Sequence, residues 1–233
     1  MTDESYTDYT VQSINDRVVI PPIRGRIKVV WEAVMSRLMQ QRKDLMKNGI
    51  YEAAVKILVK YGFEAMTMDR VAEEAGVAKG SLYNYFPNKL ELLRFVHAKT
   101  VEPMHLRATE IVAANQPAAD KLEAIFRMWS EHVGKHRGLF HFLFNEYAVQ
   151  VLLKHEGETK QQDAIEKLAA VIEQGINEGV FRPVAARQYA TLIFGAVREM
   201  CERLLASEEV FPVEEVVTVA MDFSLHGVAR QGN

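Results

Sequence analysis

Residues 73–93 read EEAGVAKGSLYNYFPNKLELL, and they decide the fold of the N-terminal part of the chain. The segment holds a glycine-containing turn, a short run rich in hydrogen-bonding side chains, then a proline and the start of a new apolar run. Gly76 ends one helical pattern and Pro87 ends the next, because glycine adopts non-helical backbone angles and proline lacks an amide donor. Two helices joined by such a turn predict a helix-turn-helix.

The residues around this segment predict further helices. Apolar side chains recur at helical spacing over residues 50–61, and Gly62 is placed to end that helix. Thr67 is placed as the N-cap of a second helix, and Asn88 with Glu91 three positions later forms the capping pattern of a fourth. The sequence therefore predicts three short helices followed by a longer one.

The rest of the chain continues the helical spacing at greater length. The nearest candidate for a strand is the short VVI at 18–20. The predicted fold class is therefore all-α, with an N-terminal three-helix helix-turn-helix domain followed by a larger helical domain. The apolar stripes of that larger domain cover residues 122–133, 139–144, 165–176, 189–204 and 216–227.

Composition limits the class of protein. The chain has 233 residues, of which 48% are hydrophobic and 25% charged, as in globular proteins with a sizeable core. Cys201 is the single cysteine, so an intrachain disulfide is excluded and a small buried side chain is the expected role. No apolar run approaches the ~20 residues that a membrane span needs. We expect a cytoplasmic protein without a membrane partner.

The net charge of −3 hides a local excess of cations. Residues 23–43 contain six basic side chains and one acidic one, and a basic segment attracts polyanions. In the opening segment, Gly80 and Ser81 let a DNA strand come close to the backbone. Lys79 and Asn84 carry donors that suit phosphates and base edges, so the sequence predicts a DNA partner.

The same region closely resembles the signature of the TetR (tetracycline-repressor-like) family of bacterial transcription regulators. The likeness is tight over residues 43–95, and Met66 and Met68 depart from the usual pattern without touching the expected DNA face. A match of this length is far more specific than a short motif. The matching residues, in order and spacing, are 62–63 (GF), 67–68 (TM), 71–72 (VA), 75–83 (AGVAKGSLY), 85–89 (YFPNK) and 92–93 (LL).

The resemblance implies a DNA-binding domain over residues 43–87 and a helical domain over residues 88–233 that binds a small-molecule effector and forms a homodimer. A two-fold dimer calls for an approximately palindromic double-stranded operator, from which the effector would release a repressor. The resemblance also implies contacts with DNA. The side chains so assigned are Lys79, Ser81 and Asn84 for the major groove, and Thr67, Tyr83, Tyr85 and Lys89 for the phosphate backbone.

Two other classes of protein remain as alternatives. An architectural DNA-binding protein would share the helix-turn-helix but sense no effector. An enzyme would need chemistry that the sequence does not display, because we find no phosphate-binding glycine loop, nucleophile elbow, HExxH motif or persuasive carboxylate pair. We therefore expect no catalytic residue and no cofactor.

The most aromatic stretch of the chain is the candidate wall of the effector pocket. Aromatic walls with a few polar groups are typical of small-molecule sites, although core packing is the alternative for each residue. His132 and His136 lie one helical turn apart with His141 close by, yet no cysteine is near, so hydrogen-bonded histidines rather than a metal site are expected. The candidate residues are Trp129, His132, Phe140, Phe144 and Tyr147.

The N-terminal region departs from the family pattern. Residues 1–42 are expected to form a flexible extension that is basic from residue 23, and residues 1–34 have no usual counterpart. Arg24 and Arg26, within PPIRGRIK, could enter an A·T-rich minor groove. A disordered or helix-extending tail, or a true start at Met35, are the alternatives.

The last two helical stripes are the candidate dimer interface. Residues 189–204 and 216–227 would form a four-helix contact between two copies, because small Ala196, Ala220 and Gly227 let helices approach closely. The alternative is that these stripes face the core of their own chain.

Overall fold

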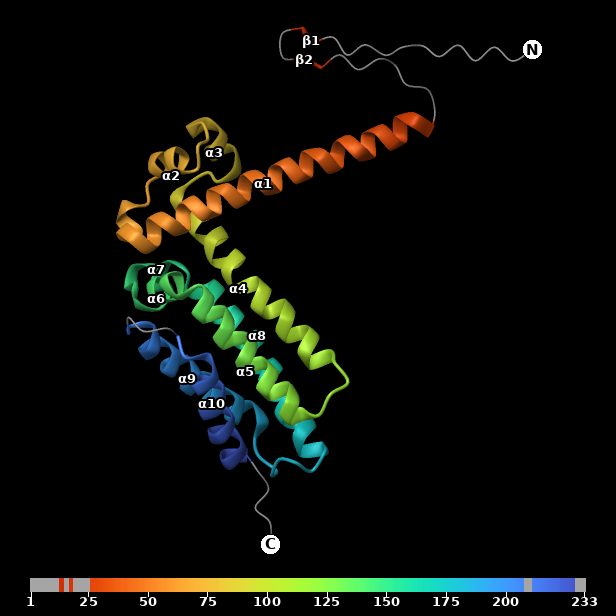
Figure 1. Ribbon diagram of the computed structural model, residues 1–233, viewed down its shortest axis with the longest axis vertical. Helices are drawn as coiled ribbons and strands as arrows, with labels where there is room; N and C mark the ends of the chain where they lie inside the picture. The colour runs from red at the N-terminus through yellow and green to blue at the C-terminus, as the bar shows by residue number, and fades with distance from the viewer. Residues whose placement is uncertain (1–12, 15–16, 19–25, 208–210, 229–233) are drawn as a thin grey trace, which may run out of the picture. The chain divides into compact units, whose positions relative to one another are not determined.

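The computed structural model describes residues 13–14, 17–18, 26–207 and 211–228, with side chains for residues 29–207 and 211–226. In these ranges the chain is helical apart from one pair of two-residue strands, which confirms the all-α class (Figure 1). The helices are α1 (Arg26–Ala65), α2 (Met68–Glu74), α3 (Lys79–Tyr85), α4 (Lys89–Ala113), α5 (Ala118–Lys135), α6 (Arg137–Asn145), α7 (Tyr147–Leu152), α8 (Lys154–Asn177), α9 (Ala186–Leu205) and α10 (Val213–Val228).

The strand pair was not predicted from the sequence. Strand β1 (Ser13–Ile14) pairs antiparallel with β2 (Arg17–Val18), and Ser13 lies opposite Val18. The strand candidate at 18–20 overlaps β2 by one residue, Val18. A two-residue pair buries no core of its own, so the fold class does not depend on it.

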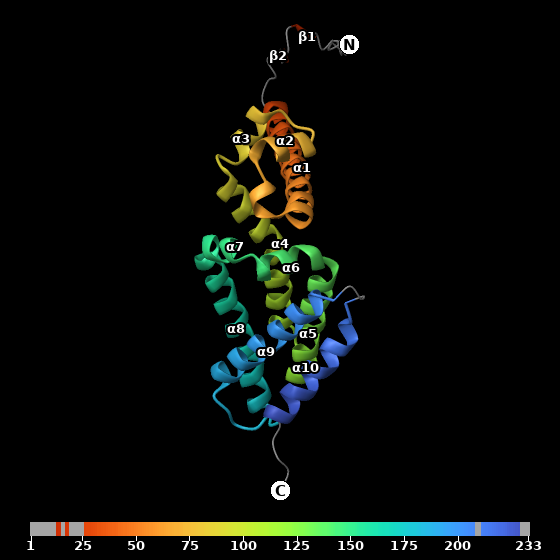
Figure 2. The same cartoon turned by 90° about the vertical axis from the view of Figure 1, so that its left-hand side faces the viewer.

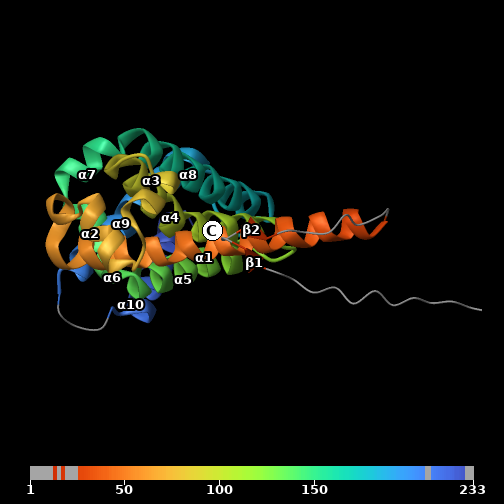
Figure 3. The ribbon, with the colours of Figure 1, turned by 90° about the horizontal axis from the view of Figure 1, so that it is seen from above.

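The chain divides into two compact units, Met1–Lys47 and Asn48–Asn233. The first unit contains the N-terminal part of α1, which begins at Arg26 and stays helical through Lys47 (Figure 3). The proposed domain boundary at residue 42 therefore falls inside a helix. The proposed minor-groove contact rests on Arg24, which lies outside the described residues, and on Arg26, whose side chain is not described.

In the second unit, local hydrogen bonds set the ends of the helix-turn-helix elements. Gly62 adopts φ 78° and ψ 178°, which interrupts the helical backbone of α1 at the residue predicted to end it. Thr67 Oγ1 accepts a hydrogen bond from the Arg70 amide at 3.2 Å, and Asn88 Oδ1 accepts one from the Glu91 amide at 2.9 Å. Both predicted N-caps are confirmed, and they fix where α2 and α4 begin.

The helix-turn-helix has a small apolar core of its own, shared between α1, α2, α3 and the start of α4. Its side chains on α1, α2 and α3 come from the predicted inward positions, whereas Leu92 of α4 was not among them. The buried members are Ile50, Ala54, Ile57, Leu58, Val71, Leu82 and Leu92.

The larger core lies where α4, α5, α8, α9 and α10 pack side by side (Figure 2). The predicted stripes supply it, and α4 runs to Ala113 with Pro103 inside it. Helix α7 was not predicted as a separate element. Fully or nearly fully buried members of the core include Leu122, Phe126, Val133, Ile165, Leu168, Ile172, Ile193 and Val197.

A close contact between a glycine and an aromatic ring closes the turn after α8. Gly179 has φ 75°, and the amides of Val180 and Phe181 both donate to Gly175 O at 3.0 Å. The turn brings the Phe181 ring, which is 1% exposed, over Gly175. A Cβ atom at position 175 would lie 2.0 Å from the ring, so the site accepts only glycine without a shift.

We predict that Gly175→Ala lowers the free energy of unfolding by about 1–3 kcal/mol, because a methyl group overpacks the site filled by Phe181. Urea titration measures the change. Gly157→Ala on the same helix is the matched control, since a Cβ there meets nothing within 4 Å. Alanine at 157 should be neutral or stabilise by up to about 1 kcal/mol. Equal stabilities for the two variants would contradict the role given to Phe181.

Candidate DNA-binding surface and ligand cavity

Helix α3 is a short helix with one buried anchor and an exposed polar side. Leu82 is 0% exposed and holds the helix against the core. Tyr83 and Asn84 are exposed, and Gly80 has no neighbour within 4 Å of a built Cβ. This side of α3 therefore offers a backbone without bulk next to an amide and a phenol.

Lys79, at the start of α3, forms an ion pair within the helix-turn-helix. Its Nζ lies 2.6 Å from Asp69 Oδ1 of α2, and both side chains are largely exposed. The hydrogen bond to Asp69 and the charge of that carboxylate raise the pKa of Lys79. An exposed pair contributes little to stability, so Lys79 can exchange Asp69 for another anion at small cost.

Lys89 lies in the first turn of α4, where a cation is unfavourable for the helix dipole. Its Nζ lies 3.8 Å from the centroid of the Phe63 ring, and the side chain is half-buried. The ring face therefore holds the ammonium group in place by a cation–π contact.

The remaining predicted DNA-binding residues differ in exposure. Thr67 is exposed, although its Oγ1 already accepts the capping hydrogen bond described above. Ser81 and Tyr85 are half-buried. The eight assigned residues thus lie at the N-cap of α2, along α3 and in the first turn of α4.

Buried hydrogen bonds join α1, α4 and α5. Tyr51 of α1 and Thr100 of α4 are joined by a hydrogen bond of 3.1 Å between their hydroxyl oxygens. Because Thr100 Oγ1 donates to Val96 O at 2.7 Å, Tyr51 is the donor to Thr100. The Thr100 carbonyl in turn bonds to Nε2 of His132 on α5 at 2.8 Å.

Aromatic rings fill the space beside these bonds. Phe95 of α4 lies with its ring centroid 4.8 Å from that of Phe86 and 6.5 Å from that of Tyr51. Helix α4 therefore packs through one side chain against both the end of α3 and the middle of α1. Movement of α4 along its axis would disturb these contacts.

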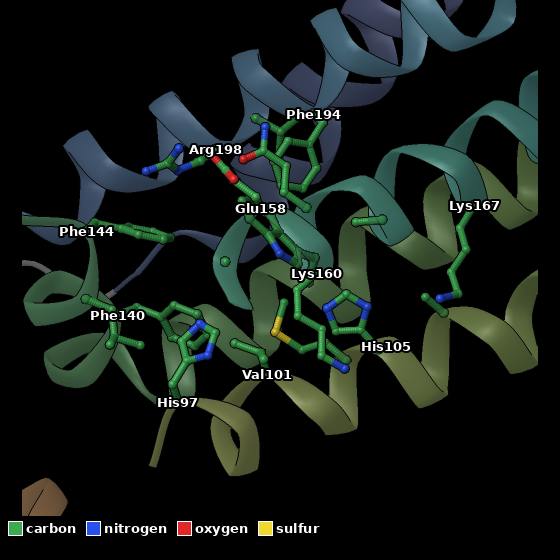
Figure 4. Close-up of a pocket in the computed structure, with 18 of the residues that line it drawn as sticks. His97, Val101, His105, Phe140, Phe144, Glu158, Lys160, Lys167, Phe194 and Arg198 are labelled. Carbon is green, nitrogen blue, oxygen red and sulfur yellow. The ribbon is translucent and has the colours of Figure 1, made fainter. Parts of the chain in front are cut away.

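A cavity of about 470 Å³ lies between α4, α5, α6, α8 and α9 (Figure 4). Trp129, Phe140 and Phe144 line it, whereas two other predicted residues do not. His132 bonds to the Thr100 carbonyl instead, and Tyr147 is 78% exposed. The other apolar wall residues include Val101, Met104, Ile125, Phe126, Leu143, Leu153, Leu168, Phe194 and Val197.

Most of the charged groups at the cavity already have a partner of opposite charge in the described chain. Lys160 pairs with Glu102, and Lys167 and His105 both contact the Asp163 carboxylate. Lys154 lies 3.9 Å from Glu158. An anionic ligand would therefore have to compete with these carboxylates for the lysine side chains.

Arg198 of α9 is the exception among the described residues at this wall. Its guanidinium lies 5.2 Å from the centroid of the Phe144 ring, and no carboxylate of the described chain pairs with it. His97 of α4 is a second polar group at the wall, and burial lowers its pKa, so it is mainly neutral near pH 7. The cavity therefore combines apolar walls with one unneutralised guanidinium.

Sequence reasoning missed Arg198 and Phe194 because it gave the stripe 189–204 to the dimer interface. One signal was available: Arg198 is a long cation inside an otherwise apolar helical run. His97, Val101 and Met104 of α4 also line the cavity.

Helices α9 and α10 each divide between an inner and an outer face. Ala220, one of the small residues expected between two copies, is 2% exposed inside its own chain. Gly227 lies outside the residues with described side chains. Leu192, Val219 and Phe223 are between 48% and 64% exposed, which leaves an apolar outer face on both helices.

The described ranges hold no group of three or more His, Cys, Asp or Glu side chains placed for a metal ion. None of their helices combines the length and apolar character that crossing a bilayer requires. Cys201 is fully buried, and burial raises the pKa of its thiol to about 12, as a structural role requires.

Comparison with known proteins identifies both parts of the second unit. Residues 50–96 match the family of bacterial regulatory proteins named tetR, and residues 115–202 match the tetracyclin repressor-like C-terminal domain. The HTH-type transcriptional regulator YhgD of Bacillus subtilis is 29% identical over 170 residues, which is 64% of this chain and 82% of that protein.

Two further likenesses cover most of the chain. The fatty acid metabolism regulator protein of B. subtilis is 21% identical over 200 residues, 82% of this chain and 98% of that protein. The structure of SmeT, an efflux-pump repressor of Stenotrophomonas maltophilia, solved with triclosan, superposes with a TM-score of 0.71 at 17% identity. It covers 81% of this chain and 93% of that one, and at this identity it shows the fold alone.

The buried contact between α1 and α4 generates a prediction. Thr100→Val should lower the free energy of unfolding by about 1–3 kcal/mol, because the Tyr51 hydroxyl is left buried without its acceptor. Adding Tyr51→Phe removes that hydroxyl. The free energy of unfolding of the double variant should therefore fall by less than the sum of the decreases in the two single variants. Urea titration of the four proteins gives the coupling. Strict additivity would show that the two hydroxyls do not interact.

Proposed function

Because the chain belongs to the TetR family of bacterial regulatory proteins, we propose that it represses transcription as a homodimer on a DNA operator and leaves the operator when a small molecule fills the cavity. Membership makes it a helix-turn-helix transcriptional regulator, and proteins of this family are typically repressors and are not enzymes. DNA is therefore its partner. A regulator that binds the bacterial chromosome acts in the cytoplasm.

The DNA contacts follow from the exposed side of α3. Lys79 and Asn84 present donors to base edges in the major groove, with Ser81 beside them, while Gly80 lets the backbone approach. Thr67, Tyr83, Tyr85 and Lys89 bind the phosphates on either side. Lys79 exchanges Asp69 for DNA in this scheme, and Lys89 reaches a phosphate from its position over Phe63.

The observation that carries the proposal is the double role of α4. One end of this helix is capped at Asn88 and packed through Phe95 against the helix-turn-helix. From His97 to Ala108 the same helix lines the cavity. A ligand that shifts α4 therefore changes the separation of the two recognition helices in a dimer, which must match the ~34 Å between major-groove faces.

Cavity chemistry indicates the class of ligand. The apolar walls suit a hydrocarbon body, and Arg198 is an unpaired guanidinium that suits a carboxylate or phosphate. We assign the cavity to an amphipathic anion, such as a medium- or long-chain acyl group with an acidic head. The name of the B. subtilis relative, a fatty acid metabolism regulator, supports this class.

The dimer would form through the outer faces of α9 and α10. Leu192, Val219 and Phe223 supply exposed apolar side chains on adjacent helices. A two-fold contact uses the same patch on both copies, so this patch is buried twice. Arg198 and Leu192 share α9, so the proposed ligand site and the proposed interface would use the same helix.

The DNA assignment predicts different effects for two classes of residue. Lys89→Ala should weaken binding to a selected operator and to random DNA alike, and should reduce the slope of log affinity against log salt by ~1. Asn84→Ala should instead change sequence preference, by ~1–3 kcal/mol for each lost base contact.

Filter binding or fluorescence anisotropy on an operator selected from a random pool measures both effects. Lys56→Ala is the control, since Lys56 is a cation of α1 that pairs with Glu74 and has no assigned DNA contact. If Lys56→Ala and Lys89→Ala behaved alike, the assignment of Lys89 would be wrong.

The ligand assignment predicts that decanoate binds the protein more tightly than decanol, because only the acid can pair with Arg198. Arg198→Met should weaken decanoate binding by about tenfold or more and leave decanol binding unchanged, as expected for loss of a hydrogen bond to a charged group. Isothermal titration calorimetry measures both. Arg203→Met is the control on the same helix, since Arg203 is 79% exposed and pairs with Glu199.

Linkage supplies the test of regulation. The selected operator must weaken decanoate binding by the same factor by which decanoate weakens operator binding, typically a coupling of ~1–3 kcal/mol. Ligand affinity that ignores bound operator would favour a DNA-binding architectural protein. Palmitoyl-coenzyme A and palmitate, titrated in parallel, distinguish a thioester from a free acid.

A further inference from the structure

The N-terminal part of α1 carries an apolar face that nothing in the described chain covers. We call residues 29–47 the N-terminal helical arm (Figure 3). No side chain of the arm is buried, although Trp31 is 41%, Leu38 52% and Leu45 72% exposed. Exposed apolar side chains gathered along one helix mark an interaction surface.

These side chains follow a seven-residue repeat. Trp31, Leu38 and Leu45 are each seven positions apart, and Val34 and Gln41 lie three positions after the first two. This is the a and d spacing of a coiled coil, which places all five side chains on one stripe. The stripe is therefore shaped to receive another helix.

We propose that the N-terminal helical arm pairs antiparallel with the arm of a second copy of this chain. In the alignment that sets Leu38 against Gln41 of the second copy, Leu45 meets Val34 of the second copy, and two-fold symmetry repeats both contacts. One surface used twice is what a symmetric homodimer requires.

Charge at the flanks of the stripe selects this direction. Arg37 precedes Leu38 and Asp44 precedes Leu45, so both occupy the g position. In the antiparallel alignment Arg37 of each arm lies beside Asp44 of the other, giving two ion pairs. A parallel pair would set Arg37 beside Arg42 of the second copy, which repels.

The same residues argue against other occupants. DNA offers no apolar groove for Trp31, Leu38 and Leu45. A helix lying in a membrane interface keeps cations at its polar flanks, whereas here Glu32 directly follows Trp31 and Arg42 falls between the two leucines of the stripe. Another helix that carries both acidic and basic side chains matches the mixed charges beside the stripe better than DNA or a membrane surface does.

The arm is too short to associate alone, because a coiled coil of isolated chains needs three to four heptads. Held on a dimer, two arms meet at an effective concentration of about millimolar, which is enough for a weak contact to form. The inference thus rests on the proposed homodimer, which the arms strengthen, and it is independent of the DNA and ligand assignments.

The experiment measures dimer dissociation of the full chain by sedimentation of fluorescently labelled protein over a dilution series. Arg37→Glu should raise the dissociation constant about tenfold, because two attractive pairs become repulsive. Arg37→Glu with Asp44→Arg should restore it, since the pairs re-form with signs exchanged. Lys43→Glu is the matched control, because Lys43 lies on the opposite side of the helix and should leave the constant unchanged.

Leu38→Glu tests the apolar stripe itself and should weaken the dimer more than Arg37→Glu does. A tighter dimer with Arg37→Glu would overturn the antiparallel pairing, as would a double variant no better than the single one. An unchanged dimer dissociation constant in the Leu38→Glu protein would also overturn the proposal. If that variant instead lost binding to anionic vesicles or to DNA, the apolar stripe would belong to that partner. A wild-type chain that is monomeric at all concentrations would sink the proposed homodimer itself.

Discussion

The rest of the structure depends on how α4 is fixed to the helix-turn-helix. A cap at Asn88, a buried hydroxyl pair between Tyr51 and Thr100, and the ring of Phe95 hold this helix at its first half. The second half of α4 continues directly from this fixed part and lines the cavity. In the proposed mechanism, α4 carries the displacement from the cavity to the helix-turn-helix.

Local chemistry made the helix-turn-helix predictable from the sequence. Thr67 and Asn88 cap helices through bonds to amides three residues away, and Gly62 marks the kink through its positive φ, so no distant contact is needed to find them. The strand pair at residues 13–18 has no such signal. Two residues a side give neither a period nor a turn pattern long enough to recognise.

The cavity was predictable only in part. The spacing of apolar residues shows which residues share one face of a helix, but it does not show which other elements pack against that face. Trp129 and Phe140 were found by their size, yet the same reasoning named His132, which turns away to the Thr100 carbonyl. Tyr147 begins a helix that the sequence did not show. Arg198 was not predicted because the apolar residues around it on α9 divide between two faces. One face packs into the core and the other lies on the outer surface, and spacing alone does not show which face Arg198 joins.

The ion pair between Lys79 and Asp69 also bears on how the protein would search a chromosome. In the proposed scheme Lys79 leaves Asp69 only where the lysine meets a base edge of the operator. At other sites the ammonium group stays with Asp69 and adds nothing to the residence time on that DNA. The ion pair would thus keep one cation out of non-specific binding, so the operator would be reached after more, briefer visits.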